Sequence, residues 1–378
     1  MPFSSGIPKL DEHLSGGFLE GKSVIIITTP GIDARAFAYQ ALQANPSVQG
    51  VYFIENTFPE QVRKDIGKYI YPQEAFRRMV FIDAFSSALG LPSTERFAAK
   101  DATKPKTILE AIDAAFQEVK PGIMVIDSLS GMDAKYAFTG GMLDKIDELK
   151  KKGVTVLCLY TSWDETESAR IGEHFDYVIE AKSVEDRMLS RSFFKIVKAP
   201  GKFIGKVIPF RVGFDGIAVY VPKVIITGPF HAGKSTFIHK ISTKAVSVNR
   251  MGTTIALDHG YVEHSGLSVD LFGTPGQERF EFMLDILNKD AFGVVLVVDS
   301  TKPEMLARAK EMLAHVSRYS LPYIVAANKQ DEKSALKPEK IKELLGLDTE
   351  VVGTVAITGE GCMEALKLLI DKIVEGGK

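Results

Sequence analysis

A glycine-rich turn that joins an apolar run to a helical stretch is the best candidate for chemistry in this chain. It reads Gly-Pro-Phe-His-Ala-Gly-Lys-Ser and follows the apolar run at 223–227. Glycines let the backbone curl so that successive N–H groups point at phosphate oxygens, a lysine adds a cation, and a hydroxyl can bind Mg²⁺. We therefore predict that a phosphate chain is bound by Gly228, Pro229, Phe230, His231, Ala232, Gly233, Lys234, Ser235 and Thr236, with Ser235 as a metal ligand.

A second motif indicates which base the site accepts. Asn328-Lys329-Gln330-Asp331 follows the apolar run that begins at residue 322. A carboxylate only accepts hydrogen bonds, so Asp331 can pair with the N1–H and 2-amino donors of guanine, whereas adenine has no such donor pair. The Asn328 amide can reach the base while bridging this loop to the phosphate loop, and the Lys329 stem can cover the ring. The motif predicts GTP and GDP as ligands.

These motifs, in this order along the chain, resemble those of the Ras superfamily of small GTPases over about 224–374. The resemblance implies that the Gly276 N–H contacts the γ-phosphate and that Gln277 is the catalytic residue that orients the attacking water. It implies that Thr254 binds Mg²⁺ and senses the γ-phosphate as part of the first switch. It also implies that the backbone of Ala356 and Ile357 approaches the guanine oxygen.

One position departs from the Ras pattern. Gly273 stands where most members carry a magnesium-associated aspartate, and Asp270 lies three residues earlier. The sequence TPGQERF is similar to the prokaryotic branch that includes the bacterial polarity GTPase MglA and its archaeal relatives, in which that aspartate is also absent. The resemblance implies weaker or altered Mg²⁺ coordination, slow intrinsic hydrolysis, protein effectors, and a Roadblock-type regulator or GTPase-activating protein. Arg250 and Arg279 are candidates for a catalytic arginine, although a solvated loop arginine is the default for each.

The beginning of the chain resembles a second family. The segment SGIPKLDEHLSGGFLEG at 5–21 is similar to the opening of RecA-like ATPases of the KaiC and RadA type, and the strand that ends at Asp127 is similar to their second magnesium-side strand. The phosphate loop of that family has changed here. Ala34 stands at the lysine, Arg35 at the metal-binding hydroxyl, and Asp33 adds a negative charge where phosphate would lie. We expect an inactive scaffold; altered nucleotide binding through Arg35 and residual ATPase activity remain open.

Two successive series of short β-rich runs and helical stretches must position these motifs. Such alternation predicts an α/β protein with parallel sheets covered by helices. We predict two P-loop NTPase-type three-layer α/β/α domains in tandem, RecA/KaiC-like over 1–221 and Ras-like over 222–378. The first series predicts strands at 23–28, 51–54, 80–83, 123–127 and 154–160 and an antiparallel edge over 177–220; the second predicts strands at 223–227, 255–264, 267–272, 292–299, 322–329 and 351–357.

Composition excludes several classes of function. The chain has 46 Lys and Arg against 48 Asp and Glu, a net charge of -2, which gives no indication of nucleic acid or anionic membrane as a partner. Two cysteines and no stretch of 18 apolar residues predict a cytoplasmic protein without disulfides. Trp163 could anchor a partner or pack against a sheet edge, and packing is the favoured interpretation. The leading hypothesis is a GTP-hydrolysing switch on a RecA-like pseudo-ATPase scaffold. The alternatives are an oligomeric dual ATPase/GTPase and a GTP-binding module with little hydrolysis.

Overall fold

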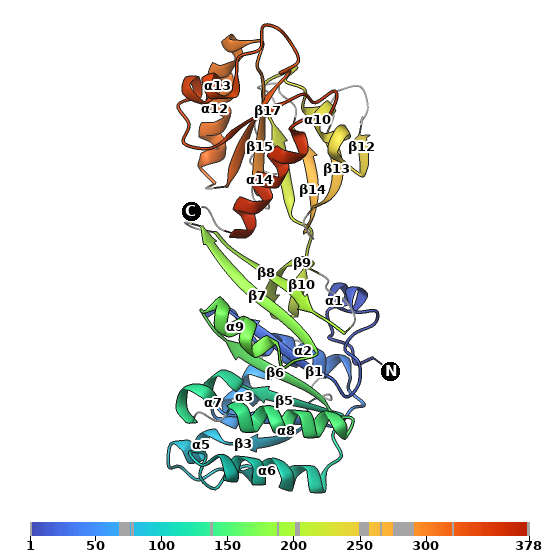
Figure 1. Ribbon diagram of the computed structural model, residues 1–378, viewed down its shortest axis with the longest axis vertical. Coiled ribbons are helices and arrows are strands. Elements are labelled where there is room, and N and C mark those ends of the chain that lie inside the picture. Colours follow the sequence, from blue (N-terminus) through green and yellow to red (C-terminus); the bar gives the residue numbers. More distant parts are fainter. Residues whose placement is uncertain are drawn as a thin grey trace. The chain divides into compact units, whose positions relative to one another are not determined.

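The computed structural model describes residues 2–67, 76, 79–136, 139–186, 189–200, 205–248, 257–264, 267–274, 291–319 and 321–375. The chain divides into two compact units. The first consists of Met1–Ser183 and Ser192–Val219, and the second of Val184–Arg191 and Tyr220–Lys378. Each unit contains one sheet with helices on both faces, so the predicted α/β class with two three-layer domains is confirmed (Figure 1).

The described part of the first unit is built on a sheet with the strand order β10-β9-β8-β7-β1-β6-β5-β2-β3-β4. The central strand β1 pairs in parallel with β6 on one side and β7 on the other. At the far edge, β8 and β9 and then β9 and β10 are antiparallel, so the predicted antiparallel edge is confirmed. Only the short β4 was not predicted. The strands are β1 (Ser23–Thr28), β2 (Gly50–Ile54), β3 (Val80–Asp83), β4 (Phe97–Ala98), β5 (Ile123–Asp127), β6 (Thr155–Thr161), β7 (Tyr177–Asp186), β8 (Leu189–Lys198), β9 (Val207–Gly213) and β10 (Gly216–Val219).

Side chains of β1 alternate between two separate cores. Val24 and Ile26 pack in one core with residues of α1, α2 and α3, while Ile25 and Ile27 pack in the other with residues of α6, α7, α8 and α9. A strand buried on both faces is typical of a parallel sheet between two helical layers. The helices are α1 (Pro8–His13), α2 (Arg35–Ala44), α3 (Pro59–Ile66), α5 (Phe85–Ala88), α6 (Pro105–Glu118), α7 (Leu129–Tyr136), α8 (Thr139–Lys151) and α9 (Glu165–Gly172).

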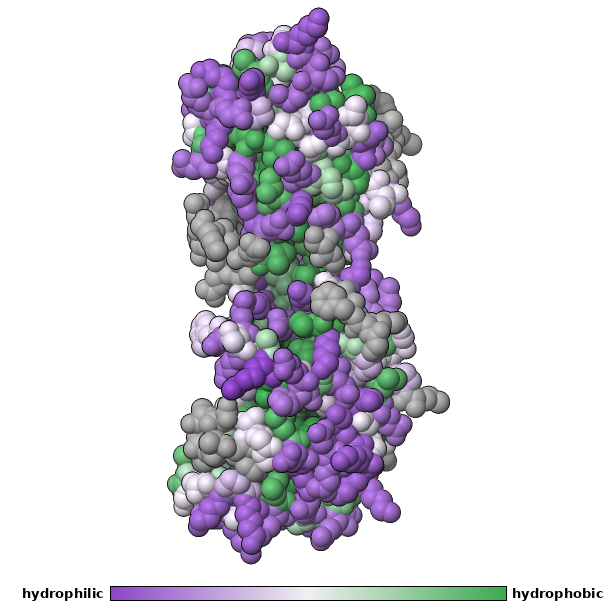
Figure 2. Space-filling view, in the orientation of Figure 1, coloured by the Kyte–Doolittle hydropathy of each residue, from purple (hydrophilic) through white to green (hydrophobic). Residues whose placement is uncertain are grey.

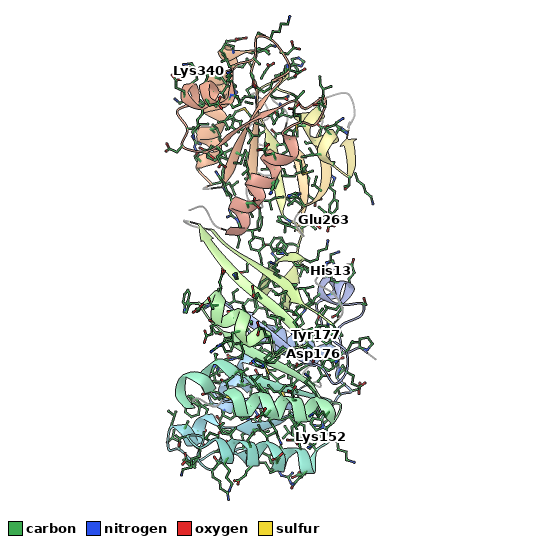
Figure 3. The ribbon with its side chains drawn as sticks, viewed as in Figure 1. His13, Lys152, Asp176, Tyr177, Glu263 and Lys340 are labelled. Carbon is green, nitrogen blue, oxygen red and sulfur yellow. The ribbon has the colours of Figure 1, made fainter. Side chains whose placement is uncertain are left out.

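A polar anchor fixes the start of β1 against the start of β7. Asp176 accepts hydrogen bonds from the backbone N–H and hydroxyl of Ser23, at 2.9 and 3.1 Å. It also forms ion pairs with the ammonium groups of Lys150 and Lys22, at 3.0 and 3.5 Å. Burial acts to raise the pKa of Asp176, but the bonds from Ser23 and Lys150 outweigh it and leave the pKa lowered. The adjacent Tyr177 hydroxyl accepts from the Leu19 N–H at 3.0 Å (Figure 3). The loop after β1 therefore extends from a firmly held strand.

In the second unit the strand order is β12-β13-β14-β11-β15-β16-β17. The central β11 is parallel to both β14 and β15, whereas β12, β13 and β14 form an antiparallel meander. The six predicted strands are confirmed, and β12 is an additional one. The strands are β11 (Lys223–Thr227), β12 (Lys244–Val248), β13 (Leu257–His264), β14 (Leu267–Gly273), β15 (Ala291–Asp299), β16 (Tyr323–Asn328) and β17 (Val351–Thr354).

Helices cover both faces of this sheet as well. Val294, Leu296 and Val298 of β15 pack with α12 and α13 in one core, and α10 and α14 lie on the opposite face (Figure 1). These elements are α10 (Lys234–Ile241), the 3₁₀ turn η2 (Pro303–Met305), α12 (Leu306–Ser317), α13 (Pro338–Leu345) and α14 (Cys362–Glu375). The first turn of α10 thus begins directly beyond the end of the central strand β11, where the phosphate motif falls.

The molecular surface departs from expectation at Trp163. Its side chain is 81% exposed, so the predicted packing against a sheet edge is wrong. It lines a cleft of about 370 Å³ with Thr29, Asp164 and Lys195. Hydrophilic residues cover most of the face seen in Figure 2. Within the described ranges, no helix is both long and apolar enough to span a bilayer.

Candidate functional site

The loop between β11 and α10 has the backbone that a phosphate cradle needs. Gly228 and Gly233 have φ values of 145° and 98°, and His231 is also left-handed at 59°. A Cβ on Gly228 would lie 2.0 Å from the Val297 carbonyl oxygen, and one on Gly233 would lie 2.3 Å from the Asn328 amide nitrogen. Both positions therefore require glycine for space as well as for φ. Of the nine predicted residues, those at 228–233 form the loop, and Lys234, Ser235 and Thr236 form the start of α10.

The Lys234 side chain folds back over this turn. Its ammonium donates hydrogen bonds to the carbonyls of Gly228 and Pro229, both at 2.9 Å. Burial lowers the pKa of Lys234 to about 8, although the charge of Asp258 acts in the opposite direction. Ser235 and Thr236 are exposed at the start of α10, as are Phe230 and His231 at the tip of the turn. A cation and a hydroxyl therefore lie at the helix end where phosphate and metal are predicted.

Asn328 connects three segments around the predicted base site. It is 2% exposed, and its amide nitrogen donates to the Ala232 carbonyl at 2.8 Å. Its amide oxygen accepts from the Ala356 N–H at 2.9 Å and from the Thr354 hydroxyl at 3.3 Å. The predicted bridge from this loop to the phosphate loop is confirmed. The bond to Ala356 was not predicted, because it depends on how β17 pairs with β16.

The rest of the base motif is arranged around an ion pair whose carboxylate is buried. Lys329 has a left-handed φ of 68°, and its ammonium lies 2.5 Å from the Asp299 carboxylate, which is 2% exposed. Burial acts to raise the pKa of Asp299, but Lys329 and Thr301 outweigh it and leave the pKa lowered. Asp331 is exposed, and no group in the described part of the chain hydrogen-bonds to its carboxylate. That carboxylate is available to an incoming ligand.

The fifth predicted element, Ala356 and Ile357, lies beside Asn328. Ala356 is buried and its N–H is already donated to Asn328, while Ile357 is 73% exposed. Three other predicted residues, Thr254, Gly276 and Gln277, lie outside the described residues, as do the two candidate arginines. Asp270, three residues before Gly273, is 3.2 Å from His259. Because side chains alternate along a strand, Asp270 faces the other side of the sheet from position 273.

These residues fit a magnesium-bound nucleotide. A curled backbone beside a buried ammonium suits a phosphate chain, a hydroxyl at the helix start suits Mg²⁺, and an open carboxylate beside a buried amide suits a base edge with two donors. Ser235 would hold a bound Mg²⁺, which would supply charge neutralisation for the phosphates. Lys234, Ser235 and Asp331 are the described side chains that such a ligand would engage.

The loop between β1 and α2 in the first unit is arranged differently. The Arg35 guanidinium forms ion pairs with Asp127 at 3.0 Å and with Asp65 at 3.2 Å. The Asp33 carboxylate accepts from the Arg35 backbone N–H at 3.1 Å, at the first turn of the helix. The loop therefore supplies its own cation and its own anion. The participation of Asp65 was not predicted.

Asp127 lies at the centre of this arrangement. It is 1% exposed, and it also accepts hydrogen bonds from the Tyr52 hydroxyl and the Asn56 amide, both at 3.0 Å. Burial raises the pKa of Asp127, and the nearby charge of Arg35 only partly offsets that effect. The residue that the family resemblance places near magnesium is thus occupied by partners from its own chain.

The two units correspond to two classes of nucleotide-fold protein. Residues 3–224 match the family model described as KaiC, an ATPase model, and residues 220–373 match the model of the ADP-ribosylation factor family. Because the KaiC model matches more than half of the length of this chain, the chain belongs to the KaiC family. The chain thus carries an N-terminal KaiC-like ATPase domain and a C-terminal Arf/Ras-like GTPase domain, as predicted at this level.

Individual relatives include two proteins of the ADP-ribosylation factor group, an uncharacterized protein and a solved KaiC-like protein. The human ADP-ribosylation factor-related protein 1 is 28% identical over 169 residues, which is 40% of this chain and 84% of that protein. The ADP-ribosylation factor-like protein 6 of Danio rerio is 26% identical over 173 residues, 43% of this chain and 93% of that protein. An uncharacterized protein of Methanocaldococcus jannaschii is 31% identical over 109 residues, 29% of this chain and 70% of that protein. A solved KaiC-like protein from Pyrococcus horikoshii has a TM-score of 0.48 at 19% identity, covering 58% of this chain and 99% of that one.

Proposed function

We propose that this protein is a GTP-binding and GTP-hydrolysing switch whose KaiC-like domain is a pseudo-ATPase scaffold. The observation that carries the proposal is the Asn328 bridge, which fixes the phosphate loop and the base motif to each other. In the same motif the exposed Asp331 carboxylate can accept the two hydrogen bonds that a guanine would donate. A phosphate cradle alone would suit any nucleotide, so it is the base motif that supports GTP as the proposed ligand.

The residues act by binding and positioning. Lys234 exchanges its two loop carbonyls for phosphate oxygens, which is favourable because a bond between two charged groups replaces one to a neutral acceptor. Ser235 and Thr254 are the proposed metal ligands, and Gly276 donates its N–H to the γ-phosphate. Gln277 orients the attacking water. Loss of the γ-phosphate releases the segments that hold Thr254 and Gln277, which is how such switches change state.

Several finer features complete the proposal. We assign the GTPase to the prokaryotic MglA-like type because of its TPGQERF sequence, with slow intrinsic hydrolysis, and place the functional boundary between residues 221 and 222. Protein effectors and a Roadblock-type regulator or GTPase-activating protein are the proposed partners. Both cysteines are free thiols, which supports a reducing compartment such as the cytoplasm.

The scaffold role rests on the first phosphate loop. ATP would have to displace Arg35 from two carboxylates and approach the Asp33 carboxylate, with no lysine at position 34 to compensate. Displacing charge-assisted bonds and bringing like charges together both oppose binding. We therefore propose that this domain does not turn over ATP.

Nucleotide selectivity tests the proposal. Binding of fluorescent GTP, ATP and xanthosine triphosphate is measured on the full chain and on Asp331→Asn. The wild type should prefer GTP over ATP by at least about 100-fold, because a rejected base leaves polar groups unpaired. Asp331→Asn should lose GTP affinity and gain xanthine affinity, since the Asn amide can donate to the 2-oxo group. Equal affinity of the wild type for GTP and ATP would sink the proposal.

Hydrolysis is tested on the same preparations. Single-turnover cleavage of GTP should depend on Mg²⁺ and fall by about 10- to 100-fold in Gln277→Leu, because leucine cannot orient water. Tight, selective GTP binding with slow cleavage that does not depend on Mg²⁺ would instead favour a binding module with little hydrolysis.

A further inference from the structure

The glycine that departs from the Ras pattern is crowded by a carboxylate from the neighbouring strand. Gly273 is the last residue of β14. A Cβ built on it would lie 3.1 Å from the Asp258 Cβ, 3.4 Å from one Asp258 carboxylate oxygen and 2.8 Å from the Ile238 Cδ1. The space into which a side chain at position 273 would extend is therefore bordered by the Asp258 carboxylate, and glycine leaves room for it.

Strand register accounts for this placement. β13 and β14 are antiparallel, and His259 is paired with Phe272. One step further along the same register places Asp258 opposite Gly273. Directly opposed residues of antiparallel strands project from the same face of the sheet. Figure 1 shows β13 and β14 side by side, next to α10. A carboxylate on Asp258 and one at position 273 would thus lie on the same face, one strand apart.

The surroundings of Asp258 point toward the phosphate loop. The side chain is 7% exposed, and its charge acts on the pKa of the Lys234 ammonium. The His239 imidazole nitrogen is 3.9 Å from its carboxylate. Lys234 and His239 both belong to α10, whose second residue is the proposed metal ligand Ser235. Burying a carboxylate is costly unless cations compensate it, and this one acts on the Lys234 ammonium, in the first turn of the helix at whose start Mg²⁺ is proposed.

We propose that Asp258 provides the carboxylate for the magnesium site of this GTPase, in place of the aspartate that Gly273 lacks. In this proposal the two residues are linked: the carboxylate is supplied from β13 by Asp258 and not from β14, and position 273 on β14 is glycine because a larger side chain there would crowd Asp258. The inference rests on the proposed GTP site. Mg²⁺ is commonly held by one or two carboxylates together with waters and phosphates, and Asp258 gives the site that charge.

The test measures metal affinity rather than turnover. Fluorescent GDP is bound to the full chain in EDTA, and Mg²⁺ is then titrated while nucleotide dissociation is followed. Asp258→Asn should raise the Mg²⁺ concentration needed to slow dissociation by about 10- to 100-fold, while GDP affinity in EDTA stays near the wild-type value. Asp270→Asn is the matched control, since it neutralises a carboxylate of the adjacent strand on the other sheet face, and it should behave as the wild type.

The outcomes separate this inference from the proposed function. If Asp258→Asn keeps the wild-type dependence on Mg²⁺, the inference is overturned while the GTP site stands. If the wild type binds no guanine nucleotide, the proposed function fails first.

A rescue variant guards against a folding artefact. Gly273→Asp alone should be crowded by Asp258 and Ile238, whereas Asp258→Gly combined with Gly273→Asp moves the carboxylate back across the strand pair. The double variant should recover the Mg²⁺ dependence that Asp258→Gly loses, with an unchanged thermal transition. A folded double variant that remains insensitive to Mg²⁺ would contradict the link between the two residues.

Discussion

Two loops in this chain, one after β1 and one after β11, connect a central strand to a helix. Each of these strands is covered by helices on both faces of its sheet. In the loop after β11, the cation is Lys234, and its partners are two neutral carbonyls of the loop itself. In the loop after β1, the cation is Arg35, and its partners are the carboxylates of Asp127 and Asp65. The same topological position therefore holds a cation that a phosphate can recruit and a cation that is already neutralised.

The comparison teaches that side-chain charge, rather than backbone topology, separates a competent loop from a scaffold. Arg35 is held by ion pairs with two carboxylates, whereas Lys234 is held by neutral carbonyls, so displacing Arg35 costs more than displacing Lys234. Asp33 adds a second obstacle, since its carboxylate already accepts a hydrogen bond at the first turn of α2, where a phosphate would bind. The pairing of Arg35 with carboxylates and the presence of Asp33 each weaken a nucleotide site. Together they favour a loop whose charged groups are paired within the protein.

The largest expected effect comes from exchanging the two cations for alanine. Lys234→Ala should raise the Kd for GTP by about 10²- to 10⁴-fold, because two charge-assisted bonds of about 1.5–3 kcal/mol each are lost. Arg35→Ala should leave that Kd within about threefold, since Arg35 and its carboxylate partners belong to a different compact unit from Lys234. Isothermal titration of both variants with GTP and ATP gives the answer. A strong loss of GTP affinity in Arg35→Ala would break the comparison.

Stability should show the reverse pattern. Arg35→Met leaves Asp127 buried without its cation and should destabilise the KaiC-like domain by about 2–3 kcal/mol, less than a fully buried pair because Arg35 is partly exposed. Calorimetry on the full chain can identify the relevant transition as the one that GTP does not raise. Arg35→Met combined with Asp127→Asn should recover most of the loss, because the unpaired charge is gone.

The pH dependence of Arg35→Met has a definite sign. Burial already raises the pKa of Asp127 above its ordinary value, and removing Arg35 takes away an effect that lowers it. The folded variant therefore binds a proton more tightly than the unfolded chain does, so lowering the pH toward 5 stabilises the folded state. The destabilisation by Arg35→Met should be smaller at pH 5 than at pH 7.5. A larger loss at pH 5 would show that Asp127 is not the residue left unpaired.

The sequence was sufficient for features that are encoded locally and insufficient for those that depend on register. The strands were predictable from apolar runs, and the phosphate and base motifs from spacing. Asp258 was missed because it lies well before Gly273 in the chain and meets it only through β13–β14 pairing. Asp65 was missed because its contact with Arg35 joins two helices through the fold. The roles of Thr254, Gly276 and Gln277 stay predictions, since these residues lie outside the described part of the chain.

The smallest effect should come from Asn328→Ala, which tests how the competent loop is held rather than how it is charged. The amide makes three hydrogen bonds, to Ala232, Thr354 and Ala356, and the loss of such neutral bonds costs about 0.5–1.5 kcal/mol each. Replacing the Asn328 side chain by a methyl group leaves only a small cavity, and we expect the loop glycines to keep their backbone conformation. GTP affinity should therefore fall by about 10- to 100-fold, which is a smaller loss than the one expected for Lys234→Ala. Faster GTP dissociation with an unchanged association rate, measured by stopped-flow fluorescence, would fit this role.

Asn328→Asp offers the sharper comparison, because it changes the charge of this side chain but hardly its size. The carboxylate still accepts from the Ala356 N–H, but its other oxygen faces the Ala232 carbonyl, to which it cannot donate. Gly233 lies against the same end of the side chain, so the space there is tight. If Asn328→Asp binds GTP as well as the wild type, the bridge does not hold the two motifs together.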